Sequence, residues 1–175
     1  NAYLQSWLHV TWSLRYGSTL EERPVYTATD CFETYPFVEP TSGVADIGET
    51  YHEFRRNIML SRNEGLTATY NRFHDPHESS DDIATLRRLH VEMDNAVAAA
   101  YGWSDLALGH GFHPTAQGTR YTLAEPARRE LLRRLLALNH ARYAEEVAAG
   151  LHDKKKSKKG GAKRNEQEDG QLGMF

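Results

Sequence analysis

Lysine is absent from the first 153 residues: all six lysines of the 175-residue chain lie at or after Lys154, whereas fourteen arginines precede it. Residues 154–175 carry seven basic and three acidic side chains, a balance of +4, so the overall charge of −3 leaves −7 on residues 1–153. Non-specific phosphate binding normally requires the opposite sign. The body is therefore not a general nucleic-acid binder, and contact with DNA needs a local arginine cluster or a larger protein around this chain.

Cysteine and long apolar runs are also scarce. The single Cys31 excludes an internal disulfide, no apolar run approaches the roughly 20 residues that span a bilayer, and no signal peptide is visible. We expect a soluble cytoplasmic protein without a membrane partner. The first residue is Asn1 rather than Met, and we expect a fragment or a processed form.

Residues 81–102 form the stretch around which the chain is organised. Asp81 and Asp82 suit the positive end of a helix, and Gly102 suits a left-handed stop. The apolar face of the expected helix is made by Ile83, Leu86, Leu89, His90, Met93, Val97, Ala100 and Tyr101, and the opposite face by Arg87, Arg88, Glu92 and Asp94. Such a helix must bury its apolar stripe, so we expect it to be scaffold.

The other expected elements follow in chain order. They are a helix over 3–16, strand-like segments at 24–27 and 31–32, an extended segment over 33–40, a helix from Asp46 (capping box with Glu49) to 62–63, a short helix or turn over 66–73, a strand at 119–123, and a helix from Pro126 to about 149 with a stripe of Leu131, Leu135, Leu138 and Tyr143. The fold class expected is mainly α (α+β), with a helical C-terminal domain of about four helices, a small N-terminal extended/β segment and a disordered tail. The segments are 1–40, 41–153 and 154–175.

Catalytic and metal motifs are weak. His74-Asp75-Pro76-His77 and His110-Gly111-Phe112-His113 lie in loops and nothing fixes a third ligand, so we interpret them as surface histidines, with Asp75 capping a backbone turn. Cys31 is interpreted as a small core residue rather than a nucleophile. The sequence has no G-x-S-x-G elbow, phosphate-cradling glycine loop or H-E-x-x-H. We assign no catalytic residue, metal or cofactor to this chain; a histidine-metal hydrolase would require stoichiometric metal.

Two kinds of arginine can be separated. The pairs 55–56, 87–88, 128–129 and 133–134 lie on helix faces and are interpreted as solvated or ion-paired. At the end of the first helix and in the turn after it, side chains could instead touch phosphates or base edges. These DNA-binding candidates are Arg15, Tyr16, Ser18 and Arg23.

The last five residues follow a flexible basic tether. They resemble the Gln-x-x-Leu/Met-Phe peptide by which bacterial replication and repair proteins dock on the DNA sliding clamp. Three apolar side chains would fill a hydrophobic groove and a glutamine would hydrogen-bond at its edge. The clamp-binding candidates are Gln171, Leu172, Met174 and Phe175. Chance occurrence of a five-residue pattern is the alternative.

Nine short stretches occur in a fixed order over about residues 6–146. They are Ser6-x-x-His9-x-x-Trp12, Tyr16-Gly17-Ser18-Thr19-Leu20, Thr29-Asp30-Cys31-Phe32-Glu33-Thr34-Tyr35-Pro36-Phe37, Gly65-Leu66-Thr67, Tyr70-Asn71-Arg72-Phe73-His74-Asp75-Pro76, Leu86-Arg87-x-Leu89-His90, Met93-Asp94-x-Ala96-Val97, Ala100-Tyr101-Gly102-Trp103 and Leu135-Leu136-x-Leu138-Asn139. The ordered set resembles the C-terminal region of large bacterial type IIG-like restriction–modification DNA adenine methyltransferases and of their relatives in phage-defence systems such as DISARM and BREX. Val38 departs from the pattern, which has a second proline there.

The resemblance implies that the S-adenosylmethionine site and the Asn-Pro-Pro-Tyr motif for the flipped adenine lie in an upstream methyltransferase domain of the same protein. Residues 1–40 would end the target-recognition region, and residues 41–153 would be a helical support. The implied role is to hold and read duplex DNA while the upstream domain methylates adenine N6.

The competing class is a stand-alone helical interaction module that docks through its tail, for example on the sliding clamp. Apolar exposure separates the two hypotheses. A methylase fragment should expose an unusually large apolar surface near Trp7, Trp12 or Phe37, whereas a stand-alone module should not.

Overall fold

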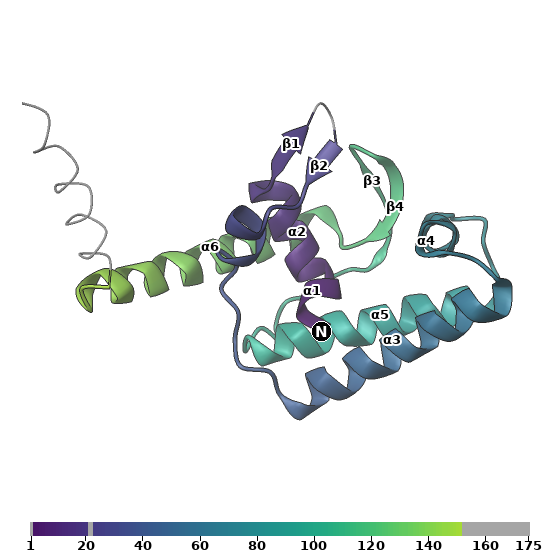
Figure 1. Cartoon of the computed structure of the whole chain (residues 1–175), viewed down its shortest axis with the longest axis horizontal. Helices are drawn as coiled ribbons and strands as arrows, with labels where there is room; N and C mark the ends of the chain where they lie inside the picture. The colour runs from purple at the N-terminus through teal and green to yellow at the C-terminus, as the bar shows by residue number, and fades with distance from the viewer. Residues whose placement is uncertain (1, 21–22, 152–175) are drawn as a thin grey trace, which may run out of the picture. The chain divides into compact units, whose positions relative to one another are not determined.

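The computed structural model describes residues 2–20 and 23–151. Within them the elements are α1 (Ala2–Gln5), α2 (Trp7–Tyr16), β1 (Ser18–Leu20), β2 (Arg23–Val25), the π-helix η1 (Ala28–Phe32), α3 (Ser42–Arg62), α4 (Leu66–His74), α5 (Asp81–Ala100), β3 (Gly111–Thr115), β4 (Gly118–Thr122) and α6 (Glu125–Ala148) (Figure 1). The described fold is mainly helical with two small two-stranded sheets, which confirms the expected class.

Helices α3 and α5 run antiparallel, side by side, and form the base of the core (Figure 1). The hydroxyl of Tyr51 on α3 lies 3.1 Å from Nδ1 of His90 on α5, and both side chains are buried. At the ends of the two helices, Arg62 donates to Asp82. Polar contacts therefore join the pair in the middle and at one end.

Helix α5 confirms the predicted buried face, but not the whole of the predicted solvent face. Ile83, Met93 and Val97 are fully buried on the predicted face. Asp94, expected on the solvent side, is also fully buried, so that expectation was wrong. Helix α2 crosses α5 at this point, and its first backbone amide, Trp7 N, donates to Asp94 Oδ1 at 2.8 Å. The carboxylate is buried because it satisfies an amide at the start of α2, which has no partner within its own helix.

Two local expectations were wrong. Helix α3 begins at Ser42, four residues before Asp46, because the hydroxyl of Thr41 accepts from Val44 N and caps the helix there. The segment around Cys31 is a π-helix rather than a strand. Here Thr27 Oγ1 donates to Asp30 Oδ2, and Thr34 Oγ1 donates to the Asp30 carbonyl. Such side-chain bonds compete with the hydrogen bonding of a strand.

Each sheet is an antiparallel hairpin. β1 pairs with β2 in the register Ser18↔Val25, and β3 pairs with β4 in the register Gly111↔Thr122. The second hairpin turns at residues 116–117 and uses Gly118 with a φ of +91°, a conformation that glycine adopts without strain. Strands near 24–27 and 119–123 were predicted, whereas their partners β1 and β3 were not.

The contacts divide the chain into two compact units, Asn1–Leu136 and Ala137–Phe175. Within the first unit, Leu131 and Leu135 of α6 are fully buried, and Leu136 packs against the core. Tyr143, expected on the same buried stripe, is 57% exposed, so that expectation was wrong. The expected segment boundary at residue 40 stays a prediction. No described helix combines the length and the apolar character needed to cross a membrane.

Candidate nucleic-acid interface

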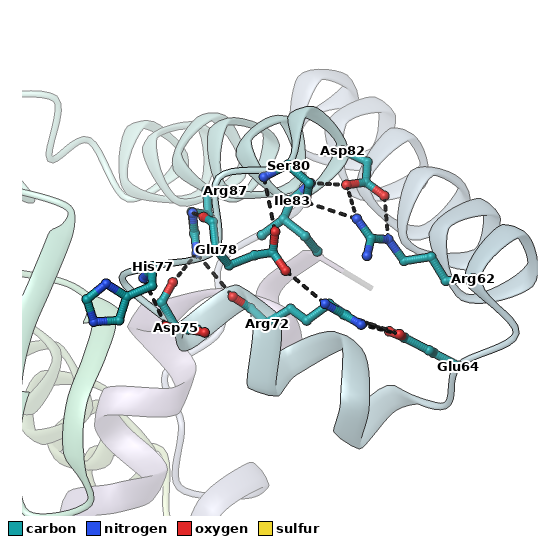
Figure 2. Close-up of polar contacts among 10 residues, drawn as sticks. All are labelled: Arg62, Glu64, Arg72, Asp75, His77, Glu78, Ser80, Asp82, Ile83 and Arg87. Atoms are coloured by element: carbon teal, nitrogen blue, oxygen red, sulfur yellow. Dashed lines mark hydrogen bonds and ion pairs between the residues drawn. The ribbon is translucent and has the colours of Figure 1, made fainter.

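Most described arginines are already engaged by protein groups. Figure 2 shows three of them around the turn that joins α4 to α5. Arg62 donates through Nε and Nη2 to the two carboxylate oxygens of Asp82, each at 2.7 Å, and these hydrogen bonds hold the pKa of Asp82 well below its usual range. This bidentate pair fixes the start of α5 against the end of α3.

Arg72 bridges two carboxylates. Its Nη2 lies 2.7 Å from Glu64 Oε1, and its Nη1 lies 2.9 Å from Glu78 Oε2 (Figure 2). Hydrogen bonds from Ser80 and from Arg72 lower the pKa of Glu78 to about 2. The charge of Arg72 is therefore already balanced within the protein.

Arg87 was expected on the solvated face of α5, and the structure shows instead that it binds backbone carbonyls. Its guanidinium donates at 2.8–3.1 Å to four of them, and its carbon Cζ lies 5.0 Å and 5.6 Å from two aromatic ring centres of the β3–β4 hairpin. The carbonyls belong to Arg72, Phe73, Asp75 and Glu78, and the rings to Phe112 and Tyr121. Arg87 thus ties the α4–α5 turn and the β3–β4 hairpin to α5.

The predicted ion pairing of the other helix-face arginines is largely confirmed. Arg88 binds Glu92, and Arg134 binds both Glu130 and Asp105. Further pairs join Arg56 to Glu53, Arg133 to Glu130, and Arg128 and Arg129 to Glu125. Arg55 differs, since it donates to the hydroxyl of Tyr70.

A cleft of about 1670 Å³ opens between α2, β2, α4, the β3–β4 hairpin and the start of α6. Four arginines line it, and we call it the arginine cleft after Arg15, Arg120, Arg128 and Arg129. Between them lie short polar side chains, which are Thr67, Asn71, Thr115 and Gln117. Small-molecule pockets are typically about 300–1,000 Å³, so the size favours a macromolecular ligand.

Two arginines of this cleft form no ion pair with any of the described residues. Within residues 2–20 and 23–151, neither Arg15 nor Arg120 has an ion-pair partner. Arg15 projects from the last turn of α2 and is exposed, and its Cζ lies 5.7 Å from the ring centre of Tyr16. Arg120 lies on β4 and is half-buried. Unpaired guanidinium groups in a polar cleft are suited to binding phosphate oxygens.

The charge of Arg120 affects the pKa of a neighbouring histidine. His74, at the end of α4, lines the cleft and packs near Trp7, with ring centres 5.9 Å apart. Burial first, and then the nearby charge of Arg120, lower the pKa of His74 to about 4. His74 is therefore neutral at pH 7 and adds aromatic surface, not charge, to the cleft.

The structure brings only part of the predicted DNA-binding set to this cleft. Arg15 lines it, Tyr16 packs on Trp12 with ring centres 4.3 Å apart, and Ser18 Oγ donates to Asp30 Oδ2 at 3.3 Å. Arg23 lies in β2, but its side chain is outside the described part. The clamp-binding candidates also lie outside the described residues; they are Gln171, Leu172, Met174 and Phe175. All eight assignments stay predictions.

The loop histidines do not assemble with one another. Asp75 Oδ1 accepts from His77 N at 2.9 Å, which confirms the predicted capped turn. His110 was expected at the surface, but its side chain is 7% exposed and its Nε2 lies 2.7 Å from Asp94 Oδ2, so that expectation was wrong. Among the described residues, no cluster of three or more His, Cys, Asp or Glu is arranged to hold a metal ion. Cys31 is fully buried, as predicted for a core residue.

Apolar exposure occurs close to the predicted place, but on other side chains. Trp12 is only 2% exposed, and Trp7 and Phe37 are half-buried. Trp7 packs on His90 of α5, and both Trp12 and Phe37 pack on Tyr35. Large apolar side chains that remain exposed nearby are Leu14, Leu20, Val25, Tyr26 and Phe32.

Sequence reasoning missed Arg120. The residue stands in the one strand predicted between the last two helices, and nothing in the linear sequence marked it as different from the paired arginines. A signal was nevertheless present, because no acidic residue occurs between Asp105 and Glu125, so Arg120 has no carboxylate at short range in sequence. Its place in a cleft depends on β3 and α4, which only the folded chain brings together.

The fold of this chain resembles part of a solved structure. No protein-family model matches the sequence, and no curated protein matches it. The chain is similar in structure to part of the type IIL restriction–modification enzyme MmeI, which was solved in complex with DNA. The TM-score is 0.56 at 20% sequence identity, and the match covers 82% of this chain and 16% of the enzyme's chain. At this identity the likeness shows a shared fold.

Proposed function

We propose that this chain is a duplex-DNA-contacting region of a restriction–modification protein, and that the arginine cleft contacts the DNA backbone. The observation that carries the proposal is the pair Arg15 and Arg120, cationic groups of one cleft without a carboxylate partner in the described part of the chain. The fold shared with a restriction–modification enzyme whose structure includes DNA supports it.

The charge distribution of residues 1–153 is consistent with DNA binding at one local site rather than over the whole surface. Residues 1–153 carry a balance of −7, and carboxylates neutralise most described arginines. A protein of this kind repels a polyanion over most of its surface and can bind it only where positive charge is left unpaired. The polar side chains between the arginines, such as Asn71 and Gln117, add hydrogen-bonding groups suited to sugar, phosphate or base edges.

A second part of the proposal concerns the activity of the whole protein to which this chain belongs. We propose that it is an S-adenosylmethionine-dependent adenine-N6 methyltransferase of a restriction–modification or phage-defence system, as the resemblance of the ordered stretches implies. The methyl transfer itself is not assigned to this chain, because its sequence contains no Asn-Pro-Pro-Tyr motif for the flipped adenine. In this proposal the chain positions the duplex, and an upstream domain transfers the methyl group.

The test is fluorescence anisotropy of a labelled duplex titrated with the purified 175-residue chain at low salt. Saturable binding is expected for the unaltered chain. The double variant R15Q/R120Q should bind at least about tenfold more weakly, because two charge-assisted contacts are lost. The matched control R88Q/R133Q removes two exposed guanidinium groups outside the cleft and should bind nearly as well. Absence of binding, or equal loss in both double variants, would overturn the proposal.

A further inference from the structure

The two other arginines of the cleft share one acidic partner. At the start of α6, Glu125 Oε2 lies 2.7 Å from Arg128 Nη2, and its Oε1 lies 3.2 Å from Arg129 Nε. All three residues line the arginine cleft, and Glu125 is the one acidic residue among the described residues that line it. One carboxylate therefore fills the space between two guanidinium groups on the wall of a basic cleft.

A carboxylate in this position makes the same contacts that a phosphate group makes. Both anions present oxygen acceptors to the planar donor fork of arginine, and a guanidinium group binds either of them with similar geometry. We propose that Arg128 and Arg129 form a further phosphate-binding subsite of the cleft, and that the carboxylate of Glu125 occupies it in the free chain. This inference rests on the proposed function, because the phosphate belongs to the DNA backbone in the same cleft.

Exposure decides whether the exchange is feasible. The side chains of Glu125 and Arg129 are 56% and 75% exposed, so Glu125 can rotate into solvent and Arg129 can turn toward an incoming phosphate. Exposed ion pairs of this kind contribute little to stability, so breaking them costs little. Arg128 is 22% exposed, so the surrounding atoms restrict its guanidinium more than that of Arg129. The Nε of Arg128 is buried and has no hydrogen-bond partner among the described residues, which leaves this donor unsatisfied in the free chain.

The ion pairs alone would not indicate a site, because α6 repeats the same arrangement, one glutamate with the arginines three and four residues later, at Glu130. Glu130 binds Arg133 and Arg134 in the same way, but none of these three residues lines the cleft. What distinguishes Glu125 is its position in the same cleft as Arg15 and Arg120, two cations that have no ion-pair partner in the described part. The repeat therefore supplies a natural control on the same helix.

A testable consequence is that Glu125 competes with DNA. Removing its charge should free both arginines for phosphate and remove one repulsive charge from the cleft. E125Q should bind duplex DNA roughly five- to tenfold more tightly at low salt, and its plot of log affinity against log salt should be steeper by about 0.9 for each added phosphate contact. The control E130Q changes the net charge by the same amount outside the cleft and should leave affinity and slope nearly unchanged.

A double-mutant cycle shows whether the effect passes through Arg129. R129Q should weaken binding only slightly in the unaltered chain, where Glu125 already holds the guanidinium, and clearly more in the E125Q background. Circular dichroism melts should show that all the variants remain folded.

The outcomes separate the two proposals. If the unaltered chain binds DNA but E125Q binds no more tightly, or if E130Q gains as much as E125Q, the subsite is overturned and the proposed function stands. Equal costs of R129Q in both backgrounds would also overturn the subsite. If neither the unaltered chain nor E125Q binds, both proposals fall.

Discussion

The carboxylate of Asp94 and the imidazole of His110 form a buried contact, with Oδ2 and Nε2 2.7 Å apart. The other oxygen of Asp94 accepts from Trp7 N at 2.8 Å, so one side chain joins the start of α2, the middle of α5 and the loop before β3. His90 Nε2 is 3.7 Å from Oδ2, too far for a hydrogen bond. Two elements that line the arginine cleft, α2 and the β3–β4 hairpin, are therefore connected to α5 through this carboxylate.

Replacing this carboxylate should therefore destabilise the fold. Asp94→Asn keeps the shape of the side chain but weakens two buried hydrogen bonds to a charged acceptor, and a loss of about 2–3 kcal/mol in the free energy of unfolding is expected. Urea denaturation measures it. The control Asp105→Asn alters an exposed partner of Arg134 and should change stability little. If D94N is as stable as the unaltered chain, the two hydrogen bonds of Asp94 do not stabilise the fold.

Arg87 should not be replaceable by another cation. Lysine keeps the charge at this position but cannot reach four carbonyls and two rings at once. R87K should lose about 1–3 kcal/mol of stability, because carbonyls of α4 and the α4–α5 turn lose their donor. The nearby exposed variant R88K should be close to neutral, and chemical denaturation distinguishes the two. If R87K is as stable as R88K, the hydrogen bonds of Arg87 do not stabilise the turn.

Stability should fall as the pH drops below 6.5. Burial lowers the pKa of His9 and of His74 to about 4, and it also lowers the pKa of His90. Between about 4 and 6.5 the unfolded chain binds more protons than the folded chain, so protonation favours unfolding in this window. Urea midpoints at pH 7 and pH 5 measure the effect. H74Q should reduce the difference between the two midpoints, and a difference of the opposite sign would contradict the burial of these rings.

The charge of Arg120 can be tested at His74 itself. Because this charge is the second cause of the low pKa of His74, after burial, R120Q should raise that pKa while leaving it below 6.5. A proton NMR titration of the imidazole measures it. The distant variant R88Q should leave the pKa unchanged. A pKa of His74 that does not respond to R120Q would show that the guanidinium does not face this part of the cleft.

Periodic apolar patterns predicted much of the helical framework. The spacing of Ile83, Leu86, Met93 and Val97 predicted α5, because a helix with such a stripe must bury it. Capping was predicted less well. The capping box at Asp46 predicted too late a start for α3, which Thr41 caps instead, and the burial of Val44 favours this earlier start.

The candidate site could be predicted only in part. Arg15 was found from its place at a helix end, whereas Arg120 depends on the pairing of β3 with β4 and on the approach of α4. The burial of Asp94 could not be predicted from helical periodicity, because its partners Trp7 and His110 come from distant parts of the chain. Long-range pairings of this kind leave no local pattern in the sequence.

The central claim, that the arginine cleft contacts DNA phosphates, is tested most directly by the salt dependence of duplex binding. Log affinity should fall linearly with log salt concentration for the unaltered chain, and R15Q/R120Q should reduce the slope by about 1.8, because about 0.9 is lost for each phosphate contact. The double variant R88Q/R133Q should keep the original slope. An unchanged slope in R15Q/R120Q would contradict the claim.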